Sequence, residues 1–166
     1  GCDLPDNCGM MRPARSESGH EPPLRLLYVG GISVGEAYDL TMLFDVVREL
    51  PGVEMTVCVR EADWNRVCDH YSVLIGNNVN IVHKSGNDLK VLLEYADIGL
   101  MFFAPSPYRS ICMPSKLFEY LSSLVPVLAL AGTASGNYVL NQGIGLCADY
   151  SRGSLKAQIT RLQDNR

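Results

Sequence analysis

Several patterns are missing from this sequence, and each absence narrows what the protein can be. No apolar run approaches the roughly 18 residues that a membrane-spanning helix needs, because Gly, Pro or charged residues break the longest candidates. No stripe of basic residues interleaved with aromatics is present, so nucleic acid is not an expected partner. The 166 residues are 47% hydrophobic and 19% charged, with a net charge of -4, which is typical of one globular domain of ordinary size.

The cysteines form no recognisable framework. They are Cys2, Cys8, Cys58, Cys68, Cys112 and Cys147. The absence of a C-x-x-C pair argues against a zinc site and against a compact set of disulfides, and no metal is expected. Cys58 and Cys147 fall in apolar runs, where a buried reduced thiol is the ordinary state, so a cytosolic location is expected. Cys112 falls in a candidate site loop but has no His nearby in sequence, which favours an inert thiol over a nucleophile.

The character of the chain changes near Pro23. Residues 1–23 are rich in Pro, Ser, Gly and Asn and are typical of a linker or irregular lead-in. From residue 24 onward, apolar runs alternate with segments of helical periodicity. Strands are expected at 24–30, 53–59, 80–83, 98–103, 127–131 and 145–148, and helices at 40–50, 62–70, 87–95, 116–124, 135–142 and 154–163. For residues 24–166 this alternation predicts an α/β fold with a Rossmann-like, doubly wound, mostly parallel sheet sandwiched by helices.

The segment PSPYRSICMPSKLFEYLSSLVPVLALA, at 105–131, is the most informative part of the chain. A loop leads into a helix that opens at Pro114-Ser115-Lys116 and carries Glu119 one turn later. A helix start offers unpaired N–H groups and a positive dipole end, which suit a diphosphate, and Lys116 adds a charge. The Glu119 carboxylate can accept hydrogen bonds from ribose hydroxyls. The alternative interpretation is an ordinary helix start with an exposed Lys116 and Glu119 pair.

Two further loops follow predicted strands, at the edge where open parallel sheets bind ligands. Gly30 and Gly31 begin a loop of small residues that lets the backbone approach phosphates, although a plain turn is the alternative. That loop matches neither G-x-G-x-x-G nor the Walker A pattern. His83 and Lys84 follow the third strand. The backbone of this loop could contact a nucleotide base, and its charged side chain could contact the phosphates. The alternative is that His83 has only a structural role.

Taken together, these segments resemble the C-terminal, donor-binding half of a GT-B glycosyltransferase, most closely the retaining family four. Gly1-Cys2-Asp3, LRLLYVGGI with ELPGVEMTVCV, and NDLKVLLEYADIGLMFF with PSKLFEYLSSLVPVLAL carry the resemblance. It implies transfer of a sugar from a UDP- or GDP-linked donor to an acceptor hydroxyl, in polysaccharide, glycolipid or glycoconjugate synthesis, without a metal or other cofactor. It also implies that Glu119 binds the ribose and that Ser115, Lys116 and Leu117, the start of the motif, face the diphosphate. Gly30 and Gly31 would close on the phosphates, the backbone near His83 and Lys84 would meet the base, and Lys116 with Arg109 would stabilise the leaving group.

The sequence also departs from the family pattern. Many relatives carry a first, sugar-handling glutamate where this chain has Ile111, and basic residues soon after the first strand where it has Gly31 and none before Arg48. Arg60, Lys84, Arg109 or Lys116 are the available substitutes. The acceptor-binding N-terminal domain is not expected within residues 1–23, so this chain alone is expected to bind nucleotide without turnover. Membrane contact, peripheral and at the inner face, is expected only through that missing domain. A sugar-nucleotide 2-epimerase of the same architecture and a non-catalytic nucleotide-binding or assembly domain are the alternatives.

Overall fold

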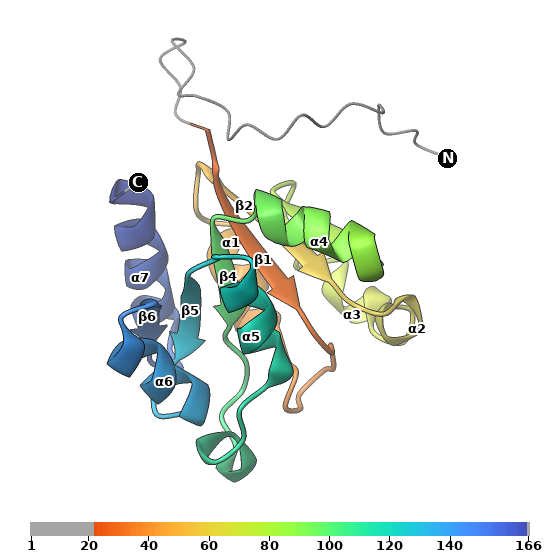
Figure 1. The fold of residues 1–166 in the computed structure, drawn as a ribbon. Helices are drawn as coiled ribbons and strands as arrows, with labels where there is room; N and C mark the ends of the chain where they lie inside the picture. The colour runs from red at the N-terminus through yellow and green to blue at the C-terminus, as the bar shows by residue number, and fades with distance from the viewer. Residues whose placement is uncertain (1–21, 166) are drawn as a thin grey trace.

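The computed structural model describes residues 22–165, which form one six-stranded sheet with helices on both faces (Figure 1). All strand pairs are parallel, and the spatial order is β3-β2-β1-β4-β5-β6. The strands are β1 (Leu24–Val29), β2 (Val53–Cys58), β3 (Val79–Val82), β4 (Ile98–Met101), β5 (Val127–Leu130) and β6 (Gly145–Ala148). The predicted Rossmann-like, doubly wound fold is therefore confirmed. Apart from Pro22 and Pro23, the expected lead-in lies outside the described residues, together with Cys2, Cys8 and the Gly1-Cys2-Asp3 motif.

β1 lies at the centre of the sheet because nearly all of its side chains are apolar and buried, which suits a strand covered on both faces. It pairs with β2 on one side, from Leu24 opposite Val53 onward, and with β4 on the other, where Leu26 lies opposite Ile98. The strand order reverses between β1 and β4. In sheets of this kind, that switch point opens a crevice at the carboxyl ends of the strands.

The helices cover the two faces of the sheet. They are α1 (Thr41–Val47), α2 (Glu61–Trp64), α3 (Cys68–Tyr71), α4 (Gly86–Tyr95), α5 (Ser115–Ser122), α6 (Ala134–Gln142) and α7 (Arg152–Asp164), with a 3-10 turn, η1, at Pro107–Ser110. Figure 1 shows α4 and α5 in front of the sheet and α1 behind it, where α1 packs against α7. Crossovers on both faces bury the strands and leave their carboxyl ends open for a site.

The structure corrects three details of the expected elements. The single helix expected at 62–70 is two short helices, α2 and α3, separated by a break. The fourth strand ends at Met101 rather than residue 103, although Phe102 and Phe103 remain buried. The turn η1 was not predicted, and it places Arg109 beneath the surface.

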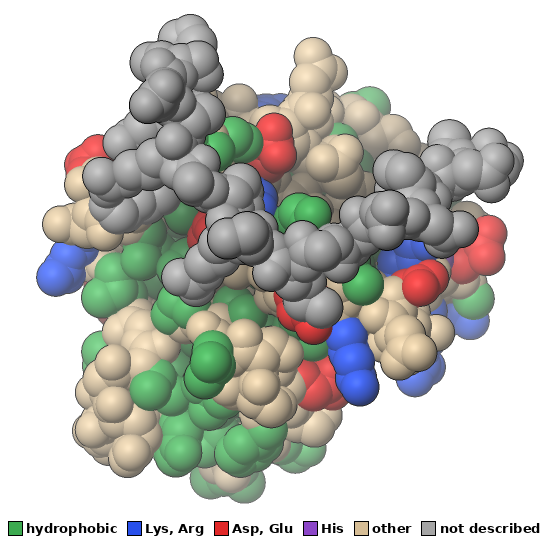
Figure 2. Space-filling view, turned by 45° about the horizontal axis from the view of Figure 1, so that its top comes forward, with side chains coloured by type: hydrophobic (Ala, Val, Ile, Leu, Met, Phe, Trp, Pro, Cys, Tyr) green, Lys and Arg blue, Asp and Glu red, His purple; other side chains and the backbone are tan. Residues whose placement is uncertain are grey.

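The opposite edge of the sheet, where the strands begin, is held by an ion pair. Arg25 on β1 donates to both carboxylate oxygens of Asp97, just before β4, with Nη2 to Oδ1 at 2.8 Å and Nε to Oδ2 at 3.1 Å. Figure 2 looks more directly onto this edge and shows basic and acidic side chains interspersed on that face. Among the described residues, no helix combines the length and the apolar character required to cross a bilayer.

Candidate functional site

Two cavities lie side by side at the carboxyl edge of the sheet. The first, here the β4-side cavity, measures about 320 Å³ and lies between the ends of β1 and β4, the turn η1 and the start of α5. The second, the β2-side cavity, measures about 800 Å³ and extends past the ends of β2 and β3. Both are lined by Val29, Gly30, Gly31, Tyr38 and Lys116. The cavities therefore meet at the end of β1, at the switch point of the sheet.

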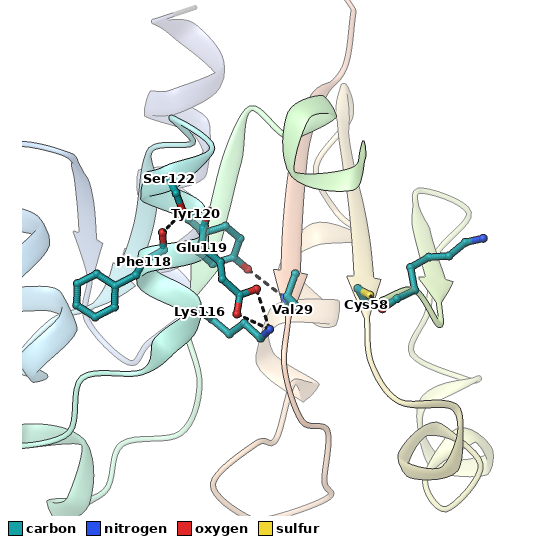
Figure 3. Close-up of polar contacts among 8 residues, drawn as sticks. Val29, Cys58, Lys116, Phe118, Glu119, Tyr120 and Ser122 are labelled. Carbon is teal, nitrogen blue, oxygen red and sulfur yellow. Dashed lines mark hydrogen bonds and ion pairs between the residues drawn. The ribbon is translucent and has the colours of Figure 1, made fainter. Parts of the chain in front are cut away.

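Helix α5 is fixed to the central strand by a buried hydroxyl. Tyr120 Oη accepts a hydrogen bond from Val29 N at 3.0 Å (Figure 3). The same Tyr120 hydroxyl donates to Leu27 O at 3.1 Å. Its ring lies so close to Gly99 on β4 that a Cβ atom there would be only 2.5 Å from it. Burial raises the pKa of Tyr120 far above its ordinary value, so this hydroxyl stays neutral. The start of α5 is thereby held at the edge of the β4-side cavity.

The N-terminus of α5 is open toward the β4-side cavity. The N-cap residue is Pro114, whose side chain makes no capping hydrogen bond to the helix N–H groups. Pro114 lines the cavity together with Ser115 and Lys116. The first N–H groups of a helix have no acceptor within it, so this end presents donors and a partial positive charge. Leu117 differs from its neighbours, because its side chain is buried in the core and its N–H donates to Pro114 O at 3.1 Å. The structure thus places Leu117 behind the site, lining neither cavity.

Lys116 and Glu119 are bonded to each other. Lys116 Nζ donates to both carboxylate oxygens of Glu119, each at 2.8 Å, and Figure 3 shows the two side chains pointing toward one another beside Val29. About a third of each side chain is exposed, so the contact is of the kind that contributes little to stability. Lys116 lines both cavities, whereas Glu119 lines neither and reaches the site only through this ion pair. The ion pair expected under the plain interpretation is therefore present, with Lys116 at the boundary of the two cavities.

Arg109 lies in the wall of the β4-side cavity and is only 7% exposed. Its guanidinium carbon is 3.6 Å from the centre of the Phe103 ring and 4.9 Å from that of Tyr38, and Nη2 donates to Ala37 O at 2.9 Å. Arg109 Nε is buried without an acceptor. Within residues 22–165 it makes no ion pair, so its positive charge is buried without a matching negative one.

The loop after β1 brings Gly30, Gly31 and Tyr38 to the boundary of the cavities. A Cβ atom at Gly30 would lie 3.0 Å from the hydroxyl of Tyr28, and one at Gly31 would lie 3.3 Å from the ring of Tyr38. The Tyr28 hydroxyl donates to Gly31 O at 2.7 Å. The absence of side chains at both glycines therefore keeps the backbone close to the cavity space.

The remainder of that loop is tied down by Asp39 and Tyr71. The Asp39 carboxylate accepts hydrogen bonds from the N–H groups of Gly35 and Thr41, and the Tyr71 hydroxyl donates to Ser33 O at 2.6 Å. Burial alone would raise the pKa of Asp39, but the bonds from Thr41 and Gly35 outweigh it and hold that pKa below its ordinary value. This network places Ala37 and Tyr38 against Arg109.

His83 and Lys84 line the β2-side cavity, as expected for the loop after β3. His83 Nδ1 lies 2.9 Å from Val59 O; since a carbonyl can only accept, Nδ1 is the donor in this contact. Lys84 Nζ is 3.5 Å from Asp88 in an exposed pair. Two acidic residues, Glu61 and Asp63, also line this cavity, so its charge is mixed.

Four other residues that the sequence singles out have clear positions. Ile111 is 82% exposed and lines neither cavity. Cys112 is half-buried and lines the β4-side cavity. Cys58 is buried as expected, whereas Cys147 is only partly buried. Within the described part of the chain, no group of three or more His, Cys, Asp and Glu is arranged to hold a metal ion.

Gly30, Gly31, Ser115 and Lys116, all predicted from the sequence, line the same β4-side cavity. Sequence reasoning missed the aromatic residues that shape that site: Tyr28, Tyr38, Phe103 and Tyr120. A signal was available for Tyr120, which lies one turn after Lys116 on the buried face of α5, but its bond to β1 spans 91 residues and has no local signature.

Solved structures share this fold. WaaG, a glycosyltransferase involved in lipopolysaccharide biosynthesis, superposes with a TM-score of 0.62 at 19% identity, over 87% of this chain and 39% of its own. Anabaena HepE, solved in complex with UDP, gives 0.65 at 15% identity, over 86% and 40%. UDP-GlcNAc 2-epimerase from Neisseria meningitidis, solved with UDP-GlcNAc bound, gives 0.61 at 16% identity, over 87% and 37%.

At these identities the likeness establishes the fold. The chain is a Rossmann-like α/β domain of the kind found in glycosyltransferases and in a UDP-sugar epimerase. It spans 37% to 40% of the length of these three proteins. No known family's sequence profile matches it, and no curated protein matches it by sequence.

Proposed function

We propose that this chain is the donor-binding domain of a GT-B glycosyltransferase and that it binds a nucleoside-diphosphate sugar. One observation carries the proposal. Two cavities meet at the topological switch point, and their shared boundary combines the glycine backbone of Gly30 and Gly31 with Lys116 at the start of α5. Backbone donors, a helix N-terminus and an ammonium group in one place are what a diphosphate requires.

The positions of the ligand's four parts follow from this boundary. The diphosphate lies at Gly30, Gly31 and the N–H groups of Ser115 and Lys116. The base lies in the β2-side cavity, near the backbone at His83 and Lys84, and the ribose lies between the two, within reach of Glu119. The transferred sugar occupies the β4-side cavity, whose volume of about 320 Å³ is at the lower end of the range for small-molecule pockets.

Lys116 and Glu119 would act as an exchangeable pair. In the free protein each satisfies the other. When a donor binds, Lys116 turns to the phosphate and Glu119 accepts from the ribose hydroxyls, so both charges gain new partners. As the bond to the sugar breaks, negative charge grows on the diphosphate, and Lys116 and the α5 N–H groups stabilise it. The proposal assigns this stabilisation to these groups and to no metal ion.

Turnover belongs to a longer protein. Because the chain spans 37% to 40% of the three structures described above, the acceptor site of such an enzyme would lie on a domain outside these residues. We therefore propose that this chain alone binds the donor without transferring it. The resemblance to WaaG supports polysaccharide or glycolipid synthesis as the setting, with cytosolic donor binding and membrane contact only through the other domain.

A sugar-nucleotide 2-epimerase is the second candidate function. The TM-score of 0.61 to the Neisseria enzyme, solved with UDP-GlcNAc bound, favours it as a specific alternative. Incubating the full-length protein with UDP-GlcNAc separates the two functions, because an epimerase forms UDP-ManNAc without an acceptor, whereas a transferase releases UDP only when one is present. A non-catalytic nucleotide-binding or assembly domain is favoured by the exposed Ile111 and would form neither product.

The test of the proposed function is calorimetric titration of the chain with UDP, GDP, ADP and dTDP, repeated with Glu119→Ala. We expect saturable binding of one nucleotide and a loss of about tenfold in the variant, since charge-assisted hydrogen bonds to the ribose disappear. Glu94→Ala, an exposed glutamate on α4, is the matched control and should bind as the wild type does.

The ion pair makes this test sharp. If Glu119 does not contact the ligand, its removal frees Lys116 from a competing carboxylate, and nucleotide binding becomes tighter instead of weaker. Tighter binding would therefore refute the ribose role of Glu119 while retaining a phosphate site. No binding of any of the four nucleotides at millimolar concentration would refute the donor-binding proposal.

A further inference from the structure

The β4-side cavity carries a charge that the nucleotide does not explain. The Arg109 side chain lines the cavity, although the residue is only 7% exposed. Within the described residues, no carboxylate forms an ion pair with it. Its contacts are two aromatic rings and one backbone oxygen, and Nε has no acceptor. Burying a cation is costly unless an anion or a full set of hydrogen bonds compensates it, so this arrangement favours a negatively charged ligand group.

The lining of the cavity supports the same conclusion. The two charged side chains in it, Arg109 and Lys116, are both cationic, and no Asp or Glu contributes to it. Most of the remaining lining is aromatic, apolar or backbone, with hydroxyls from residues such as Ser115 and Ser135. A neutral sugar is held through its hydroxyl groups, which need acceptors as well as donors. This cavity holds two cationic donors and no carboxylate acceptor to match them.

The diphosphate has its own partners nearer the end of β1. Gly30, Gly31 and Lys116 line both cavities, so the phosphate position lies at their junction, whereas Arg109 lines the β4-side cavity alone. Arg109 is thus placed for the group beyond the phosphates. An arginine fork matches a carboxylate, which it binds through two parallel hydrogen bonds.

We propose that the transferred sugar is a uronic acid and that Arg109 binds its carboxylate in the β4-side cavity. This inference rests on the proposed function, and it names the class of sugar that the site takes. The aromatic rings of Phe103 and Tyr38 hold the guanidinium in one orientation, and the bond to Ala37 O ties it to the loop after β1. The carboxylate then supplies the negative charge that the residues lining the cavity do not provide.

The test compares sugar nucleotides that differ at one carbon. The chain is titrated with UDP, UDP-glucose and UDP-glucuronate, or with GDP, GDP-mannose and GDP-mannuronate if the guanosine nucleotide is the one that binds. We expect the uronate to bind about tenfold or more tightly than the neutral sugar, as a charge-assisted bidentate contact requires. In Arg109→Gln that ratio should fall to about one, while affinity for the plain nucleotide changes by less than about twofold.

Two variants keep the result interpretable. Arg109→Lys keeps the charge but loses the fork, so it should retain part of the preference for the uronate. Arg66→Gln, an exposed arginine whose side chain is 76% accessible, is the matched control and should leave the ratio unchanged. Retained binding of the plain nucleotide shows that each variant is folded.

The outcomes separate this inference from the proposed function. If the nucleotide binds but the wild type does not prefer the uronate, the inference is wrong and the donor site stands. If Arg109→Gln weakens the plain nucleotide as much as the uronate, Arg109 is a phosphate contact and the inference is again wrong. If no nucleotide binds, both proposals fail.

Discussion

The two cavities share one boundary but differ in how the chain builds them. The β4-side cavity is the smaller, about 320 Å³ against about 800 Å³, and its charged lining is entirely cationic. Its wall contains side chains fixed by contacts with several distant segments; Arg109, for example, contacts Phe103, Tyr38 and Ala37 O. The β2-side cavity is lined by side chains of both signs, among them Glu61, Asp63 and Lys84.

This difference indicates two modes of recognition on one edge of the sheet. A cavity lined by exposed charges of both signs can receive a planar group by shape and backbone contacts, because those charges are well solvated and weakly discriminating. A cavity that buries one unpaired cation discriminates by charge. Removing a single side chain should therefore weaken nucleotide binding strongly at the shared boundary and weakly in the β2-side cavity.

The largest effect is expected from Lys116→Met, because Lys116 lines both cavities. Loss of a charged phosphate contact should weaken nucleotide binding by about 10- to 100-fold, measured by calorimetry. Lys84→Met, in the β2-side cavity alone, should cost only about two- to threefold and less at high salt, since its pair with Asp88 is exposed.

The control for both lysine variants is Lys90→Met, an exposed residue on α4. Its affinity should equal that of the wild type. If Lys84→Met proves as harmful as Lys116→Met, the two cavities contribute equally to phosphate binding and the contrast drawn between them is wrong.

The next effect concerns how α5 is attached to β1. Tyr120→Phe keeps the ring against Gly99 but leaves Val29 N–H and Leu27 O without the buried hydroxyl. The free energy of unfolding should fall by about 1–3 kcal/mol, measured by urea denaturation, because buried polar groups lose their partner. Tyr95→Phe, whose side chain is exposed on α4, is the matched control and should change stability little.

Ligand binding by the same variant then sharpens the comparison. If Tyr120 positions the start of α5, Tyr120→Phe should also weaken nucleotide binding at protein concentrations and temperatures where it is fully folded. Unchanged stability would show that packing of the ring, rather than the hydroxyl, attaches the helix.

The smallest effect, and one that depends on pH, is expected from Asp39→Asn in the loop that carries Tyr38. Because the pKa of Asp39 in the folded protein is held below the ordinary 3.8, the ionised carboxylate stabilises the fold above that pH. This contribution is lost as pH falls through the folded pKa. The variant should therefore be less stable at neutral pH by about 1 kcal/mol or less, and the deficit should shrink below about pH 4.

Thermal unfolding of both proteins between pH 3 and 7 measures this dependence. Asp164→Asn, at the exposed end of α7, is the control and should show a difference that does not follow the same profile. A deficit for Asp39→Asn that stays constant down to pH 3 would contradict the role assigned to the carboxylate.

Much of the fold was predictable because it depends on local patterns. The run LRLLYV is apolar apart from Arg25, and a strand buried on both faces requires that composition, so β1 and its burial follow from it. α1 ends at Val47, earlier than the expected 50, but Pro51-Gly52 still makes the turn into β2, and Gly52 has a φ of 71°, which suits glycine. The alternation of strands and helices then fixes the fold class.

The remainder depends on contacts between distant segments. The burial of Arg109 requires Phe103, Tyr38 and Ala37 to converge, and the bond to Ala37 spans 72 residues. Nothing near Arg109 in sequence distinguishes it from an exposed arginine. Similarly, the pairing of Lys116 with Glu119 in the free protein was foreseen only as an alternative, because their spacing suits both an ion pair and two separate ligand contacts. The roles of these residues in binding stay predictions.

The position of β1 at the switch point has a consequence for the order in which the protein can be built during synthesis. β1, β2 and β3 are complete by Val82, whereas β4, which pairs with the other side of β1, begins only at Ile98. Until β4 is added, β1 has an open edge whose N–H and C=O groups can pair with another chain. A chain ending before Ile98 would contain most of the β2-side lining and none of the β4–α5 wall. We expect such a nascent or truncated form to be the most prone to self-association.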